Sequence, residues 1–307
     1  MRNFSPNSKN IFIYDKIESK SYRNSVDKIA YIDYFYELPD KLIENIDEIP
    51  FGTKFYEKEF FANNIENKYN TILEKITCKG KSWINDKIIN EIMTQKEKEL
   101  FAQLIAIQYL RMPDIRQKYS DARKKTTLIS SDILKSFLSH KNPTLKKEFE
   151  NISVEYNEDF DPILHSEMYT DEKLYVGIAN QMLKKHWIYF ITENNDFYTS
   201  DNPIIIKPHI EKQRPYYGGI GMKGAEIIFP ISSSILLTMW DENYFEIVEQ
   251  KHDSFNKIND KQKREYNSLQ YIFSNRQTYL YNNDFNIIKT IISCNNGNEF
   301  FIKNQEF

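Results

Sequence analysis

The sequence predicts an α+β fold in which a helical first half packs on a mostly antiparallel sheet, with a further long helix near the C-terminus. Apolar residues recur at helical spacing between about residues 55 and 185. Short apolar runs separated by turn residues follow from residue 187. The connections between these runs are short, which favours hairpins, because parallel strands need longer crossovers.

Composition indicates a globular chain. Its 307 residues are 40% hydrophobic and 15% aromatic, which is enough to build a buried core. No repeat or low-complexity linker divides the sequence, so we expect one domain, 1–307, and rank two domains second. This domain would contain N-terminal strands in 1–50, a helical part in 55–185, and a sheet plus a helix in 187–307. The net charge of -3 gives the whole molecule no attraction for polyanions, so a nucleic-acid partner would need a local basic patch.

The first half begins with extended structure and continues as helices. Residues 11–15 form a candidate strand, which we expect to pair with the aromatic-rich stretch 30–38. Apolar periodicity predicts helices over 55–77 and 85–112. It also predicts a long third helix after Pro113 that packs on the second.

The second half alternates short strands and turns. A helix from Thr170 to about Lys185 leads into a strand at 187–192, and we expect 197–199 to return as the second strand of a hairpin. Further predicted elements are strands at 204–206, 226–230, 235–240 and 245–248, a helix over 256–281, and a tail with 285–292 and 300–302 that closes the sheet.

A run of polar residues, Thr199-Ser200-Asp201-Asn202-Pro203, stands between two of these strands. A turn stabilised by its own Asp201 or Asn202 side chain explains the run without a ligand. Alternatively, a rigid turn presents an acid at the end of a strand, where loops often carry function. Both interpretations stay open at this point.

Polar residues on two predicted helices offer further candidates. Glu59 and Glu66 border the apolar stripe of the first helix, either as solvated residues or at the edge of a cleft. Gln108 and Arg111 lie on the apolar face of the second helix, where each needs a fixed partner or a polar pocket. Basic residues on the third helix form either a solvated face or a phosphate contact: Arg116, Lys118, Arg123, Lys124 and Lys125.

Cys78 and Cys294 are far apart and lack the spacing of a zinc site, so we expect free thiols. The sequence has no apolar run long enough to cross a bilayer. A reducing cytoplasm is therefore the expected location, and no membrane partner is expected.

Several separated stretches carry short motifs whose order and spacing are informative together. They are 2–5 with the Ile11 strand, the helix with Glu59 and Glu66, 105–113, 199–203, 229–232, and Asn267 with Arg276. Together these stretches resemble one bacterial family, the domain of unknown function 4238. The resemblance covers nearly the whole chain and implies no established activity, only recurrent polar positions. Members usually carry a histidine- and proline-containing segment before the Leu-Arg-Asn-Phe stretch, and Met1 stands in its place here.

Two classes of function fit these residues. In the first, the chain is a metal-dependent, nuclease-like effector that cleaves phosphodiesters in conflict with phage or rival cells. Mg²⁺ or Mn²⁺ would be held by Asp201, Glu59 and Glu66, and catalysis would use Asp201, Arg111 and Gln108. Nucleic acid or a nucleotide would contact the residues expected to bind substrate, which are Ser200, Asn202, Arg276 and Asn267. In the second class, the same polar pocket serves a non-catalytic ligand sensor or partner-binding protein. The first class requires Asp201 and Arg111 to face one hollow.

Overall fold

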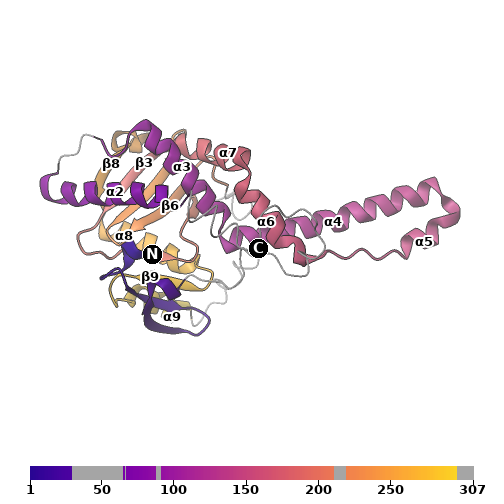
Figure 1. Cartoon of the computed structure of the whole chain (residues 1–307), viewed down its shortest axis with the longest axis horizontal. Helices are drawn as coiled ribbons and strands as arrows, with labels where there is room; N and C mark the ends of the chain where they lie inside the picture. The colour runs from indigo at the N-terminus through magenta and orange to yellow at the C-terminus, as the bar shows by residue number, and fades with distance from the viewer. Residues whose placement is uncertain (30–64, 66, 88–90, 211–218, 296–307) are drawn as a thin grey trace.

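The computed structural model describes residues 1–29, 65, 67–87, 91–210 and 219–295. It confirms the α+β class, because helices are combined with two mostly antiparallel sheets (Figure 1). The two sheets differ in the parts of the chain that supply their strands. One contains strands that are nearly continuous in sequence, whereas the other joins the N-terminal hairpin to strands from the second half of the chain.

The larger sheet has the strand order β5-β6-β7-β3-β8. Adjacent strands of this sheet pair antiparallel except for β3 and β8, which pair parallel. Burial continues along both faces of β3, β6 and β7, so both faces of the sheet must be covered. The strands are β3 (Lys185–Ile191), β5 (Ile205–Pro208), β6 (Ala225–Ser232), β7 (Ile235–Asp241) and β8 (Ser254–Lys257).

Helices cover one face of this sheet. Trp187, Tyr189 and Ile191 of β3 point into the core that includes Phe101 and Ile105, as the two-residue period of a strand requires. Figure 1 shows the covering helices lying across the strands. They are α2 (Asn67–Asp86), α3 (Gln95–Leu110) and α7 (Glu172–Leu183).

The opposite face packs on α8 (Asp260–Ile272). Here Ile188 and Phe190, which alternate with the residues above, meet Tyr266 of α8. Beyond α8 lies the smaller sheet, of order β2-β1-β9-β4, together with α9 (Asn286–Asn295). Its strands are β1 (Asn10–Asp15), β2 (Lys20–Ser25), β4 (Thr199–Ser200) and β9 (Gln277–Leu280).

The expected packing of the third helix on the second is wrong for most of its length. Helix α4 (Pro113–Lys141) projects away from both sheets and carries α5 (Lys146–Glu150) at its far end (Figure 1). Its apolar seam therefore faces solvent, and Ile129, Ile133 and Phe137 are more than half exposed. Helix α6 (Asp161–Thr170) follows the returning chain, and short 3₁₀ turns complete the elements: η1 (Arg2–Phe4), η2 (Val26–Lys28), η4 (Pro143–Leu145), η5 (Glu158–Phe160) and η7 (Glu246–Lys251).

Strand pairing corrects several predictions. The strand at 187–192 is present, but 197–199 does not return beside it, because β4 pairs with β9 of the other sheet. Residues 245–248 are not a strand, because Phe245 is the N-cap of the 3₁₀ turn η7 and the next three residues belong to that turn. The tail at 285–292 forms α9 and does not close the sheet, and 300–302 lies outside the described residues.

Two helix predictions were too long. The helix predicted over 256–281 ends at Ile272 and is followed by β9. The helix predicted over 85–112 begins only at Gln95, after a capping box in which Thr94 and Glu97 bond each other's backbone N–H. Strand β1 pairs with β2, and the expected partner 30–38 lies outside the described residues. In the described part of the chain, no helix is both long and apolar enough to span a membrane.

Candidate functional site

The Ser-Asp-Asn-Pro turn lies at the end of β4 and is hydrogen-bonded to the loop between α8 and β9. The Asp201 carboxylate accepts three backbone N–H groups from this loop. Its Oδ1 accepts from Asn275 at 2.8 Å, and its Oδ2 accepts from Arg276 at 2.7 Å and Gln277 at 2.9 Å. These bonds hold the loop that leads into β9, so most of the hydrogen-bonding capacity of Asp201 is used by the fold.

The positive charge of Lys16 acts on this carboxylate. Its Nζ donates to the backbone oxygens of Ile272 at 3.0 Å and Ser274 at 2.7 Å, at the C-terminal end of α8. Burial lowers the pKa of Lys16 to about 8, against the opposing effect of Asp201. Burial raises the pKa of Asp201, although the three backbone bonds and Lys16 act in the opposite direction.

Ser200 and Asn202 bind the same helix end. The Ser200 hydroxyl donates to Gln270 Oε1 at 2.9 Å, and Gln270 Nε2 donates to the Pro203 oxygen at 3.0 Å. Asn202 Nδ2 donates to the Phe273 oxygen at 2.9 Å, while its buried Oδ1 has no partner among the described residues. The two side chains therefore attach the turn to α8.

Asn267 of α8 is fully engaged with the chain that precedes β4. Its Oδ1 accepts the Tyr198 backbone N–H at 3.0 Å, and its Nδ2 donates to the Asp196 oxygen at 2.7 Å. The residue is 2% exposed. Of the four residues predicted to bind substrate, Asn267 alone also lines the pocket described below.

Arg276 reaches the N-terminal hairpin. Its Nε donates to Asp15 Oδ2 at 2.7 Å, and one terminal nitrogen lies 3.2 Å from Glu18 Oε1. The Asp15 side chain is completely buried, so Arg276 supplies part of the charge compensation that a buried carboxylate requires.

Arg111 and Gln108 lie elsewhere. Both belong to the end of α3, which covers the face of the larger sheet opposite to α8. The positive charge of Arg111 acts on Tyr69 of α2 and His165 of α6, whose pKa values respond to it. The expected hollow shared by Asp201 and Arg111 is therefore not formed, because the elements that hold them lie on opposite sides of the sheet.

The proposed metal ligands Glu59 and Glu66 lie outside the described residues. Within the described ranges, no group of three or more His, Cys, Asp or Glu side chains is arranged to hold a metal ion. Several basic residues of α4 have local partners. Lys118 binds Asp114 at 2.8 Å, and Lys124 binds Glu158 at 2.7 Å.

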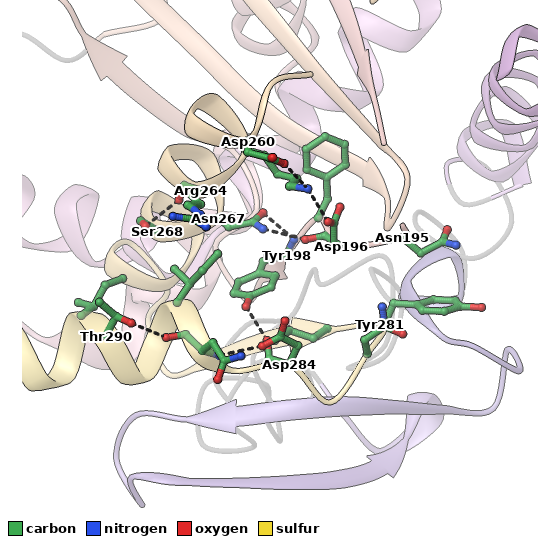
Figure 2. Close-up of a pocket in the computed structure, with 17 residues that line it drawn as sticks. Asn195, Asp196, Tyr198, Asp260, Arg264, Asn267, Ser268, Tyr281, Asp284 and Thr290 are labelled. Carbon is green, nitrogen blue, oxygen red and sulfur yellow. Dashed lines mark hydrogen bonds and ion pairs between the residues drawn. The ribbon is translucent and has the colours of Figure 1, made fainter. Parts of the chain in front are cut away.

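A pocket opens directly beside the Asn267 network (Figure 2). It has a volume of about 570 Å³, within the range of small-molecule sites. One wall is α8, another is the segment before β4, and the third is the β9–α9 connection with the first turns of α9. Tyr198 stands between these walls, and its hydroxyl donates to the Asp284 oxygen at 2.6 Å.

Charged groups of this pocket were not identified from the sequence. Lys263 Nζ lies 2.6 Å from Asp196 Oδ2, and Arg264 and Asp284 also line the site. Lys263 and Arg264 are ordinary residues of a predicted helix, and Asp284 falls between that helix and the predicted tail. The available signal was the polar stretch 281–286, which ends one element and begins the next.

Comparison with known proteins gives one match. The family model described as "Protein of unknown function (DUF4238)" matches residues 1–284. The chain belongs to this family. No curated protein and no solved structure matches the DUF4238 chain. The match includes the Ser-Asp-Asn-Pro turn, α8 and β9, and it ends at Asp284 beside the pocket.

Proposed function

We propose that this DUF4238 protein is a non-catalytic binding protein and that the pocket beside Asn267 holds its ligand. The observation that supports this function best is the pocket itself. Buried hydrogen bonds fix its walls, in particular those of Asn267 to Tyr198 and Asp196. A cavity with fixed walls, apolar side chains and a few polar groups is typical of ligand sites.

The polar residues of the turn support this choice indirectly. Asp201 Oδ2 already accepts two backbone N–H groups, so a cation at this oxygen would have to displace them. Arg111 belongs to the opposite side of the sheet, which separates the groups proposed for phosphodiester chemistry. It is simpler to assign Asp201 a structural role and to place the ligand in the neighbouring pocket.

Metal-assisted phosphodiester cleavage with Mg²⁺ or Mn²⁺, acting on nucleic acid or a nucleotide, is the alternative proposal. It keeps Asp201, Glu59 and Glu66 as ligands and keeps the phage-defence role suggested above. A cytoplasmic location is proposed with either function, and the two free, exposed thiols of Cys78 and Cys294 agree with a reducing environment.

A pocket-filling variant tests the binding function. Ser268 lines the pocket and Lys261 lies exposed on the same helix outside it, so Ser268→Trp and Lys261→Trp form a matched pair. We expect a panel of small metabolites to contain a compound that raises the melting temperature of the parent and of Lys261→Trp but not of Ser268→Trp.

The same preparations should be assayed with RNA, DNA and nucleotides in the presence of Mg²⁺ or Mn²⁺. Divalent-dependent cleavage that is lost in a folded Asp201→Asn variant would contradict the binding function and support the alternative. Absence of any pocket-dependent shift across the panel would also contradict it.

A further inference from the structure

The charges around the pocket are not equally available to a ligand. Lys263 is 14% exposed in its side chain and lies between two carboxylates, 2.6 Å from Asp196 Oδ2 and 3.2 Å from Asp260 Oδ1. Asp196 Oδ1 in turn accepts the Thr192 hydroxyl at 2.7 Å. Lys263 and Asp196 therefore neutralise each other and brace the wall of the pocket.

Two opposite charges of the pocket, Arg264 and Asp284, lack an ion-pair partner among the described residues. Arg264 is exposed on α8, and within the described part of the chain it has no ion-pair partner. Asp284 precedes α9, and its Oδ1 accepts the Asn286 backbone N–H at 3.1 Å. Among the described residues no cation is paired with the Asp284 carboxylate. With respect to the described residues, Arg264 and Asp284 are therefore an unpaired cation and an unpaired anion on different walls of the same pocket (Figure 2).

Apolar side chains line the same pocket beside these charges. Tyr198 and Leu280 are buried, and Ile287 and Ile291 of α9 add partly exposed aliphatic surface. The Tyr198 hydroxyl is held by the Asp284 backbone oxygen, so the tyrosine ring presents a fixed apolar surface. A ligand that matches this lining carries both charges and an apolar portion between or beside them.

We propose that the pocket binds a short zwitterionic peptide with an apolar side chain. Asp284 receives the ammonium group, Arg264 receives the carboxylate, and Tyr198, Leu280 and Ile287 contact the side chain. A guanidinium suits a carboxylate because it can donate two parallel hydrogen bonds. This inference rests on the binding function proposed above and specifies the class of ligand.

Isothermal titration of the full chain with three probes tests the assignment. The probes are leucyl-leucine, N-acetyl-leucyl-leucine, which lacks the ammonium group, and leucyl-leucine amide, which lacks the carboxylate. We expect the parent to bind leucyl-leucine at least tenfold more tightly than either derivative. Each derivative loses one charge-assisted contact, and a tenfold loss is a modest value for such a contact.

Two variants assign the charges to their residues. Arg264→Gln should bind the amide and the free dipeptide equally, while it retains the preference for a free ammonium group. Asp284→Asn should bind N-acetyl-leucyl-leucine and the free dipeptide equally, while it retains the preference for a free carboxylate. Lys261→Gln, which changes a charge on the same helix outside the pocket, should keep both preferences.

The outcomes separate this inference from the function on which it rests. Equal affinity of the parent for the three probes, or preferences that neither pocket variant alters, would overturn the peptide assignment. If the dipeptide does not bind but another compound shifts the melting temperature of the parent and not of Ser268→Trp, the ligand class is wrong and the binding function stands. If no compound raises the melting temperature of the parent without raising that of Ser268→Trp, the ligand class and the binding function are both wrong.

Discussion

Asp201 Oδ2 accepts the backbone N–H of Arg276 at 2.7 Å, while the Arg276 guanidinium points away to the buried carboxylate of Asp15. Two residues that the sequence singled out therefore do meet, but through the backbone of a loop. The contact connects β4, the end of α8, β9 and the N-terminal hairpin. It explains why these polar residues stand together without requiring a substrate between them.

Buried His165 should make the protein sensitive to acid. Burial lowers its pKa to about 4, and its Nε2 lies 2.7 Å from the Leu110 backbone oxygen, to which it donates as the neutral ring. Because the unfolded chain binds the proton with a pKa near 6.5, the free energy of unfolding should fall as the pH drops from about 6.5 to 4. Over this window the shift corresponds to about 3 kcal/mol.

Urea unfolding of His165→Gln at pH 7 and pH 4 checks this effect. The amide can still donate to Leu110 but does not titrate, so the loss of stability between the two pH values should shrink by about 3 kcal/mol. His140→Gln, at an exposed position of α4, should retain the pH dependence of the parent. An unchanged pH dependence in His165→Gln would show that another group is responsible.

Gly80 allows α2 to approach the larger sheet closely. A Cβ at this position would lie 2.5 Å from Ile235 Cδ1 and 3.3 Å from its Cγ1, in a fully packed core. Gly80→Ala should therefore lower the free energy of unfolding by about 1–2 kcal/mol, despite the better helix propensity of alanine.

Gly177 of α7 provides the matched control. A Cβ there meets nothing within 4 Å, so Gly177→Ala should raise the stability by up to about 1 kcal/mol. Chemical denaturation of the two variants measures both signs. Stabilisation by both substitutions would mean that α2 does not lie against β7 as closely as described.

Asn267 should be essential to stability because both ends of its amide are bonded inside the protein. Asn267→Leu leaves the Tyr198 N–H and the Asp196 oxygen without their partner, which should cost about 2–4 kcal/mol. Ser268→Ala on the next residue removes only a bond to the Arg264 backbone oxygen within the helix. Its melting temperature should stay close to that of the parent, and an equal loss in both variants would contradict the role of Asn267.

The sequence predicted the strands that are apolar and compact, but not their partners. The apolar runs at 187–191, 226–230 and 235–240 are nearly continuous because these strands are buried on both faces. The partner of β4 is set by contacts with β9, some 80 residues later in the chain, which no local pattern contains. The same limit explains the missed parallel pairing of β3 with β8.

The candidate site was predicted in part. Local chemistry identified Asp201 and Asn202 as turn residues, and this interpretation agrees with their hydrogen bonds to the loop and to α8. The interpretation that joined Asp201 to Arg111 needed the relative placement of α3 and α8, which depends on which face of the sheet each helix covers. The polar stretch 281–286 marked the boundary at which Asp284 lies, but nothing local connected it with Arg264, because a pocket arises from the packing of several elements.

The free energy of unfolding of Asp201→Asn tests the structural role of the turn most directly. Asparagine keeps the shape but offers one acceptor and one donor to three backbone N–H groups, so we predict a loss of about 3 kcal/mol in urea. Asp260→Asn, at a side chain that is 87% exposed, should change stability by less than about 0.5 kcal/mol. An Asp201→Asn variant as stable as the parent would contradict the account, because the carboxylate would then be free to serve a ligand or a metal ion.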